Sequence, residues 1–294
     1  MQLERRDQEL AHSLELADAR QQIEKICSVL HLGTGNYNPS TSRLYTDLGL
    51  LTCRPDFGED ATNLFNLLTG ICQFQGMRKL LIAPFELHSK LISLIDREIE
   101  RARRGLPARI IAKLNSLVDQ KVIEALYRAS QAGVKIDLIV RGICCLRPGV
   151  KGLSTNITVR SIVDRFLEHS RIYYFENGCQ PEVFVASADW MPRNFFRRIE
   201  VVFPIEDGVL RDRIINEILA VSLADNTKAR LLQSDGSYQL VRAAKGETAR
   251  RSQVEFIALA NSEDMSKARS NRRKSKHPQV KLAPRPASAG GKKA

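Results

Sequence analysis

The chain has 294 residues, of which 43% are hydrophobic, so it is long enough for one large domain or two smaller ones. Its longest apolar runs, such as IDLIV at 136–140, have the length of a strand, which excludes a membrane-spanning helix, and we expect no secretion signal. The net charge of +12 is concentrated in residues 265–294, which hold ten Lys and Arg and no acid, against 35 bases and 33 acids elsewhere.

The first part of the chain predicts two helices on either side of a polar loop. Residues 1–29 combine good helix formers with apolar residues at roughly helical spacing. A short strand-like piece then leads into HLGTGNYN at 31–38, whose small hydrogen-bonding residues are typical of a turn. EDATNLFNLLTG at 59–70 predicts a second helix that ends at Gly70.

From residue 80 onward, predicted strands and helices alternate. We expect strands at 80–84, 108–115 and 135–142, with helices at 85–104 and 119–132 between them. Further strands are expected at 156–161, 171–176, 181–187 and 198–204, then a helix at 207–223 and a hairpin at 234–238. This alternation predicts an α/β protein with a parallel or mixed sheet covered on both faces. Ligands of such sheets bind at the carboxyl ends of the strands.

Residues 261–294 are the last predicted segment, a disordered basic tail rich in Pro, Ser, Gly and Lys. Such a tail can contact a polyanion through the release of counterions. A solvated tail without a partner is an equally good interpretation.

The six cysteines are scattered, and none forms a C-x-x-C pair. They are Cys27, Cys53, Cys72, Cys144, Cys145 and Cys179. This spacing favours neither a zinc site nor a disulfide framework. Buried thiols in a reducing compartment are the simpler interpretation, which predicts a cytoplasmic protein.

Two side chains at predicted strand ends have the chemistry of a phosphate site. Arg141 ends the most apolar strand, and its guanidinium offers a rigid set of donors to phosphate oxygens. An arginine paired to a surface carboxylate is the alternative interpretation. His169 lies where a helix-like segment passes into a strand, which makes it a candidate acid or base, although a lone histidine is usually structural.

Other polar residues gather near further strand ends. Asp189 and Trp190 come at the end of VFVASADW, and Arg197 and Arg198 open RRIEVVF. The loop at 34–36, Thr-Gly-Asn, combines close backbone approach with side-chain donors, although by itself it signals only a turn. Together these groups predict a site for several phosphates.

The segment His88-Ser89-Lys90 with Asp96 downstream nearly spells H-x-K-x-x-x-x-D, the pattern of phospholipase D-like enzymes. The aspartate comes one residue too late. The segment also reads as the start of a helix, in which residues two apart point to different sides. We therefore expect His88 not to be catalytic.

The order of several segments resembles the C-terminal half of polyphosphate kinase, the bacterial family that works through a phosphohistidine. The resemblance runs from about Leu30 to about Leu259. It is carried by HLGTGNYNPSTSRLYTDLGLLT (31–52), KLNSLVD (113–119), LIVRGICCLRPG (138–149), SIVDRFLEHSRIYYFENG (161–178) and VFVASADWMPRNFFRRIE (183–200).

The resemblance implies phospholipase D-like α/β domains around one tunnel-shaped site, in which ATP gives its γ-phosphoryl group to a histidine and then, reversibly, to polyphosphate. Tyr45 looks like the residue that packs on adenine. Arg141 and Arg198 look like phosphate contacts. His169 looks like a catalytic histidine that also contacts ATP, and His31 looks like a supporting histidine beside the nucleophile.

The chain departs from the family pattern upstream of the loop. The family has an N-terminal helical domain, a head domain and half of a catalytic domain that are absent here, including the usual Mg²⁺ ligands. His12 lies nineteen residues before His31, which is the family spacing for the nucleophile. However, Leu14 replaces the expected lysine, and the segment predicts a helix instead of a strand. We therefore expect weak or no turnover.

These features predict four segments and leave three functions open. The segments are a divergent helix at 1–29, a remnant of the first catalytic domain at 30–75, the second catalytic domain at 76–260 and the tail at 261–294. The functions are a weakly active polyphosphate kinase, an inactive remnant that binds nucleotide or polyphosphate, and a half-enzyme that needs a partner. The family also implies dimers or tetramers. A phospholipase D-like phosphodiesterase is a distant further alternative.

Overall fold

The computed structural model describes residues 29–40, 42, 44–70 and 73–271. The chain divides into two compact units, Met1–Gln253 and Val254–Ala294. Residues 1–28, which include almost all of the predicted first helix, and the end of the predicted tail from residue 272 lie outside the described residues. Helix α8 (Ser252–Asn271) continues into the segment predicted to be disordered, because the residue types up to 271 still favour a helix.

The first unit contains a nine-stranded sheet with the order β13-β12-β7-β6-β5-β9-β10-β11-β4. Its strands are β4 (Leu81–Ala83), β5 (Arg109–Leu114), β6 (Lys135–Val140), β7 (Ile157–Ile162), β9 (Arg171–Phe175), β10 (Glu182–Ala186), β11 (Glu200–Pro204), β12 (Ala229–Leu232) and β13 (Tyr238–Leu240). β5, β6 and β7 are parallel, and the other neighbours pair antiparallel. The mixed sheet that the sequence predicts is therefore confirmed.

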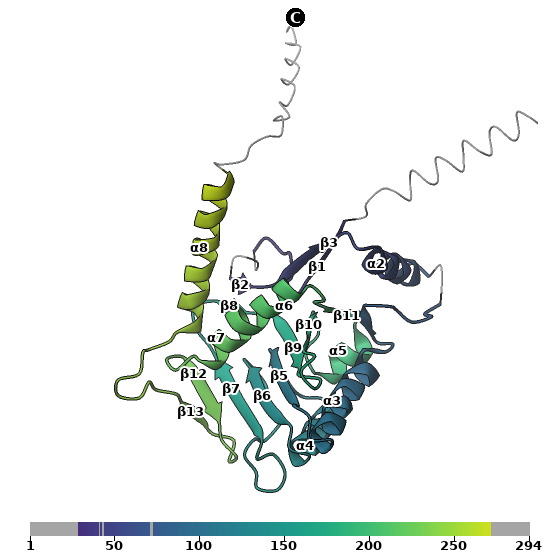
Figure 1. Ribbon diagram of the computed structural model, residues 1–294. Helices are drawn as coiled ribbons and strands as arrows, with labels where there is room; N and C mark the ends of the chain where they lie inside the picture. The colour runs from purple at the N-terminus through teal and green to yellow at the C-terminus, as the bar shows by residue number, and fades with distance from the viewer. Residues whose placement is uncertain (1–28, 41, 43, 71–72, 272–294) are drawn as a thin grey trace, which may run out of the picture. The chain divides into compact units, whose positions relative to one another are not determined.

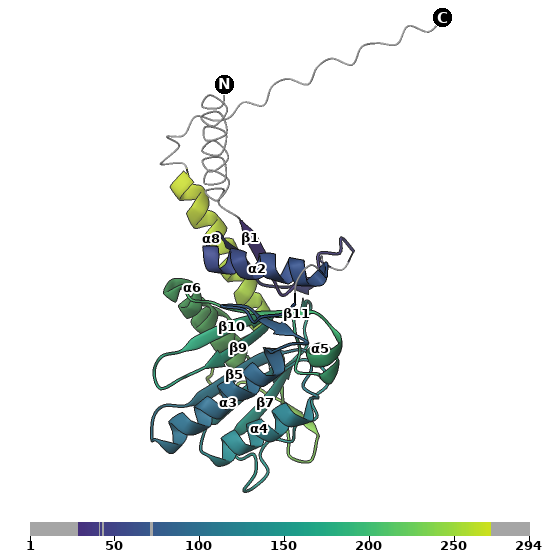
Figure 2. The same cartoon turned by 90° about the vertical axis from the view of Figure 1, so that its right-hand side faces the viewer.

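Helices cover both faces of this sheet because strand residues alternate between two cores. Ile110, Ala112 and Leu114 of β5 belong to a core with α3 (Leu87–Arg103) and α4 (Gln120–Gln131). Ile111 belongs to the second core, which includes residues of η1 (Ile214–Leu219), a π-helical segment between α6 (Gly208–Arg213) and α7 (Ala220–Leu223). Figures 1 and 2 show α3 and α4 on one face and α6 on the other. The α/β fold flanked by helices is thus as predicted.

Within the first unit, the segment at 30–52 forms small strands outside the nine-stranded sheet. β1 (Leu30–Gly33) and β3 (Gly49–Thr52) form an antiparallel pair, and β2 (Tyr45–Thr46) pairs in parallel with β8 (Leu167–Glu168). Four leucines of this segment pack on the second core: Leu30, Leu32, Leu48 and Leu50. α2 (Pro55–Leu68) follows and buries Phe57 and Leu64 in the same core.

The chain segments that carry the predicted site residues meet on the side of the sheet where several strands end. We call this side the edge of the sheet. β5, β6 and β10 end there, while β9 and β11 begin there, since Lys113 pairs with Ile172 and Ala186 pairs with both Arg171 and Val202. β1 and β3 lie beyond the same edge in both views (Figures 1 and 2). The arrangement fits the expectation that ligands bind at the carboxyl ends of strands.

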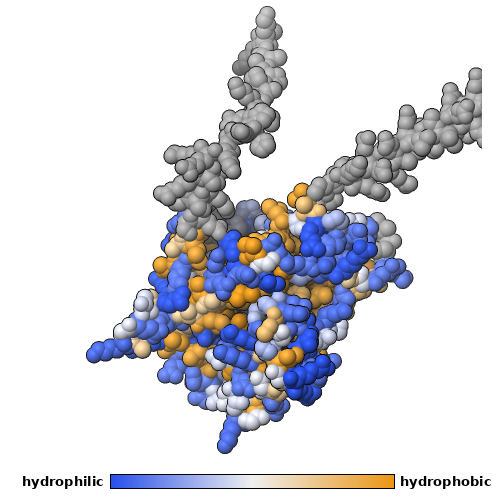
Figure 3. Space-filling model, viewed as in Figure 1, coloured by the Kyte–Doolittle hydropathy of each residue, from blue (hydrophilic) through white to orange (hydrophobic). Residues whose placement is uncertain are grey.

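The surface carries apolar side chains near the pair β1–β3. Val29 and Leu51 are 73% and 71% exposed, and Figure 3 shows orange residues in this region. Within the described part of the chain, no helix is both long and apolar enough to cross a membrane.

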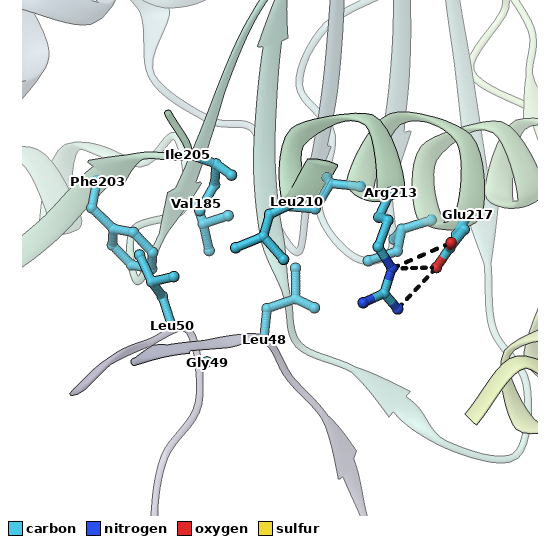
Figure 4. A pocket seen from close by; sticks show the side chains of 11 residues that line it. Leu48, Gly49, Leu50, Val185, Phe203, Ile205, Leu210, Arg213 and Glu217 are labelled. Atoms are coloured by element: carbon cyan, nitrogen blue, oxygen red, sulfur yellow. Dashed lines mark hydrogen bonds and ion pairs between the residues drawn. The ribbon is translucent and has the colours of Figure 1, made fainter. Parts of the chain in front are cut away.

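An apolar cavity of about 190 Å³ lies between β3 and the helix pair α6–η1 (Figure 4). Leu50, Val185, Phe203 and Leu210 are among its lining side chains. Arg213 and Glu217 form an ion pair of 3.1 Å within the lining. This mostly apolar lining is unlike a phosphate site.

Candidate functional site

His169 lies between β8 and β9 and is held by residues that precede it by more than a hundred positions. Its ring stacks on Tyr45, with centroids 5.0 Å apart and an interplanar angle of 23°. Its Nδ1 lies 3.1 Å from Oδ1 of Asp47, and this oxygen also accepts a 2.8 Å hydrogen bond from the Thr34 hydroxyl. The side chain remains 21% exposed. Tyr45 and Asp47 therefore orient the ring, which stays partly exposed.

Arg171 lies beneath His169, at the start of β9. Its Nη1 donates a 2.8 Å hydrogen bond to the His169 carbonyl and lies 3.0 Å from each ring nitrogen. Its Nε and Nη2 donate to Asp189, at 3.2 and 2.9 Å. Both charged side chains are almost fully buried, which fits a bidentate, hydrogen-bonded ion pair. Asp189 therefore keeps the guanidinium fixed beside the histidine.

A continuous chain of hydrogen bonds connects this pair to Arg141. Asp189 accepts a 2.7 Å hydrogen bond from the backbone N–H of Asn115, and Nε of Arg141 donates a 2.8 Å hydrogen bond to Oδ1 of Asn115. Nδ2 of Asn115 is buried and has no hydrogen-bond partner. A buried donor without an acceptor is costly, so this amide is a candidate ligand group.

Arg198 lies at the same edge but in separate contacts. It follows α5 (Pro192–Arg197), is 53% exposed, and its Nη1 is 4.0 Å from Oε1 of Glu200. Four strand spacings, β6-β5-β9-β10-β11, separate the strands next to Arg141 and Arg198. At about 4.8 Å per spacing, their backbones are roughly 19 Å apart. An extended anion can reach both side chains.

His31 does not join this cluster. The ring is exposed on β1, lies 3.1 Å from the Tyr37 hydroxyl through Nε2, and packs edge-on against the Tyr37 ring. Among the described residues, no hydrogen bond connects it to His169, Arg141 or Arg198. Its predicted role beside the nucleophile stays a prediction, because His12 lies outside the described residues.

The loop at 34–36 supports Asp47. The Thr34 hydroxyl accepts a hydrogen bond from the Leu48 N–H at 3.0 Å and donates to Asp47. A Cβ added at Gly35 would lie 2.6 Å from Oδ2 of Asp47, so glycine allows the carboxylate to approach the backbone. The Thr34 hydroxyl therefore positions Asp47. The sequence had instead suggested that this hydroxyl would donate to phosphate.

His88 has structural contacts only. Its Nε2 lies 3.1 Å from Oδ1 of Asp119, the residue that caps α4, and its ring packs against Phe195 and Phe196. Asp96 pairs with Arg128 on the surface. That this segment is not a phospholipase D-like catalytic motif stays a prediction.

Comparison with protein-family models gives a match over most of the chain. Residues 80–253 match the model of the polyphosphate kinase C-terminal domain 2. The chain belongs to the polyphosphate kinase family. Residues 11–74 match the model of C-terminal domain 1 of the same family, a range that contains both His12 and His31.

Curated relatives agree with this family. A polyphosphate kinase of Synechocystis sp. is 51% identical over 252 residues, which are 86% of this chain and 34% of the relative. One from Burkholderia vietnamiensis is 56% identical over 229 residues, 78% of this chain and 33% of the relative. The chain thus spans about a third of the length of the curated relatives it matches.

A solved relative supports the fold. The crystal structure of polyphosphate kinase from Porphyromonas gingivalis matches with a TM-score of 0.76 and 42% identity, over 81% of this chain and 36% of that one. The suspected polyphosphate kinase resemblance is confirmed by these comparisons.

The described residues of this family member do not provide a metal site. No group of three or more His, Cys, Asp and Glu side chains among them is placed to hold an ion. The Mg²⁺ that the resemblance implies therefore stays an expectation.

Three residues that contact His169 or its neighbours were not among the site residues predicted from the sequence. Asp47 and Arg171 touch His169, and Lys113 contacts residues 168 and 170 from β5. The spacing of His169 and Arg171, two residues apart before a strand, was a usable signal, because alternate residues share a face. Nothing in the sequence alone connects residue 47 or residue 113 to residue 169.

Proposed function

We propose that this chain carries nucleotide- and polyphosphate-binding groups of an ATP:polyphosphate phosphotransferase. In that reaction the bond between the γ-phosphorus of ATP and the bridging oxygen breaks, ADP leaves, and the phosphoryl group forms a bond to a histidine nitrogen. The phosphoryl group then passes from the histidine to the end of a polyphosphate chain, and the reverse reaction makes ATP. The observation that carries the proposal is the hydrogen-bonded chain from Arg141 through Asn115, Asp189 and Arg171 to His169.

Charge neutralisation and positioning are what phosphoryl transfer requires of a protein. Arg141 uses Nε to hold Asn115, which leaves its terminal nitrogens for phosphate oxygens. The unpartnered Nδ2 of Asn115 offers a further donor beside it. Arg198 is exposed roughly 19 Å along the edge, so it serves a different part of an extended anion.

His169 has the contacts of an oriented acid or charge stabiliser. Asp47 binds Nδ1 and Arg171 approaches both ring nitrogens, and together they fix the ring so that its exposed part can meet a phosphoryl oxygen. Tyr45 covers one face of the ring and offers its own second face to a base such as adenine. These roles for Tyr45 and His169 follow the family resemblance and are consistent with the geometry.

Turnover by this chain alone is expected to be weak. The nucleophile position would fall on His12, where Leu14 replaces the lysine of the family pattern. Without the covalent relay, transfer must pass directly between two polyanions. An inactive binding remnant, or a half-enzyme completed by a partner chain, therefore remains the alternative. Oligomerisation, contact of the basic tail with a polyanion and a cytoplasmic location also stay proposals.

Calorimetric titration with ATP tests the binding proposal. We expect saturable binding, weakened at least tenfold by Arg141→Ala or His169→Ala, because each change removes a contact to phosphate worth about 1.5–3 kcal/mol. Arg128→Ala is the matched control, since Arg128 is an exposed arginine whose ion-pair partner among the described residues is Asp96. Absence of ATP binding by the unchanged chain, or equal loss in the control, contradicts the proposal.

Labelling with γ-³²P-ATP separates the catalytic alternatives. We expect little acid-labile phosphohistidine on the isolated chain. Strong labelling at His12 would show that the relay is intact and that the chain is an active kinase. ATP binding without labelling supports the binding remnant or the half-enzyme, and recovery of labelling on mixing with a chain that supplies the upstream domains identifies the latter.

A further inference from the structure

His169 follows a strand that has little support of its own. β8 has two residues, Leu167 and Glu168, and its one partner among the described strands is β2, which is equally short. The backbone N–H of His169 continues this pairing with a 3.0 Å hydrogen bond to the Thr46 carbonyl. Isolated pairs of this length are not stable in water, so the position of His169 requires contacts from elsewhere.

Gln253 supplies contacts to the segment that leads into His169. Its Oε1 accepts a 2.9 Å hydrogen bond from the Phe166 N–H, and its Nε2 donates a 2.9 Å hydrogen bond to the Phe166 carbonyl. One side-chain amide thus satisfies both polar groups of a backbone residue, as a neighbouring strand would. Nε2 also donates to Oε1 of Glu168 at 3.1 Å, and Gln253 is only 3% exposed.

Lys113 holds both sequence neighbours of His169. Its Nζ lies 2.9 Å from Oε2 of Glu168 and donates a 3.0 Å hydrogen bond to the Ser170 hydroxyl. All three side chains are buried. In extended backbone, residues 168 and 170 point to the face opposite residue 169, so fixing both from one ammonium group sets the direction of the His169 side chain.

The three side chains Lys113, Glu168 and Gln253 form a hydrogen-bonded unit, which we call the clamp. Glu168 uses Oε1 for Gln253 and Oε2 for Lys113. The residues before Gln253 are also fastened, because Arg251 pairs with Asp164 at 2.6 Å. A buried ion pair is weak evidence for stability, since desolvation offsets its attraction, but it can fix one geometry. The clamp is therefore better explained by precision at residue 169 than by stability.

We propose that Lys113 and Gln253 are positioning residues that act through Glu168 to hold the His169 ring between Tyr45 and Asp47. The link to phosphoryl transfer rests on the function proposed above, but the geometric effect does not. A substitution in the clamp should move the ring without removing any group that touches phosphate.

Nuclear Overhauser contacts between the rings of His169 and Tyr45 measure the geometric effect directly. In Gln253→Met, which keeps length but removes the three hydrogen bonds, we expect these contacts to weaken at least threefold, by loss of the 5.0 Å stacking. We also expect carbethoxylation of His169 to accelerate relative to His31. The matched control is Gln131→Met, in which a surface glutamine loses a single bond to the Gly152 carbonyl.

A second variant keeps the proposal testable if Gln253→Met does not fold. Lys113→Met combined with Glu168→Leu replaces the ion pair by apolar side chains and leaves no buried charge unpaired. Unaltered ring contacts in both this variant and Gln253→Met would overturn the proposal, whereas loss in both but not in Gln131→Met supports it.

The consequence for ligand binding is measured separately. We expect ATP affinity to fall about tenfold in Gln253→Met, which corresponds to about 1.4 kcal/mol. If the unchanged chain does not bind ATP, the proposed function fails, and the ring contacts still decide whether the clamp positions His169. If ATP affinity is unchanged while the ring moves, the clamp has no functional role.

Discussion

The orientation of a histidine ring depends on the groups around it. Most of the groups around His169 come from distant parts of the chain. Asp47 and Tyr45 approach from the segment before α2, Arg171 from the next strand, and Asp189 from the end of β10. Predicted residues Arg141 and His169 belong to one hydrogen-bonded chain, and Arg198 lies along the same edge. Asp47 and Arg171 were missed, because a carboxylate or an arginine in a sequence does not identify its partner.

The adjacent Cys144 and Cys145 allow a test at the scale of single residues. Burial raises the pKa of the Cys144 thiol to about 11, whereas Cys145 is exposed. At pH 8 only about one Cys144 thiol in a thousand is ionised. We expect iodoacetamide to label Cys145 at least tenfold faster than Cys144, as measured by peptide mass spectrometry. Equal labelling rates in the folded protein would contradict this environment for Cys144.

Elements with long periodic patterns were predictable, and very short ones were not. Most elements from β4 to α7 match the strands and helices expected between 80 and 223, because apolar runs and their spacing distinguish the two, but α5 was not predicted. β2 and β8 have two residues each and show no period. Both adjoin the candidate site, so the elements that position His169 are those with the weakest sequence signal.

At the scale of elements, the N-terminal caps of α4 and α6 allow a test of how burial changes the contribution of a cap to stability. Asp119 caps α4 by accepting from the Val122 N–H, also lies 3.1 Å from Nε2 of His88, and is 4% exposed. Asp207 caps α6 through the Leu210 N–H alone and is exposed. We expect Asp119→Ala to lower the free energy of unfolding by about 2–4 kcal/mol and Asp207→Ala by about 1 kcal/mol. Urea denaturation measures both, and a larger loss for Asp207→Ala would refute the comparison.

At the scale of the molecule, the buried carboxylate of Asp225 connects segments of the first unit. Asp225 accepts hydrogen bonds from the N–H groups of Lys228 and Ala229 at the start of β12, and from both the N–H and the hydroxyl of Ser252. It is 1% exposed. This carboxylate therefore joins the edge of the sheet to the segment that contains Gln253.

The charge on Asp225 predicts a dependence of stability on pH. Burial alone would raise the pKa of Asp225, but the hydrogen bonds from Ser252 and the 227–229 turn outweigh it and lower the pKa. The unfolded chain then binds the proton more readily, so the stabilisation is present above about pH 4 and is lost as the pH falls through the native pKa.

Asp225→Asn isolates this contribution. We expect the difference in unfolding free energy between the unchanged chain and Asp225→Asn, measured by denaturation from pH 7 to pH 3, to shrink in acid. Measuring the difference removes the effect of other carboxylates, which titrate in both proteins. A difference that stays constant over this range would show that Asp225 does not contribute through its charge.

The sequence by itself determined the α/β class, the order of the larger elements and the family, because these depend on periodicity and on motifs that stay contiguous. It also identified Arg141 and His169 as groups at strand ends. Only the tertiary structure decided which side chains meet: that Asp47 reaches His169, that Arg171 is fixed by Asp189, and that Lys113 and Gln253 hold Glu168. Hydrogen bonds and ion pairs act over about 3 Å, and the distances between these residues are set by strand order and register, which no local pattern encodes.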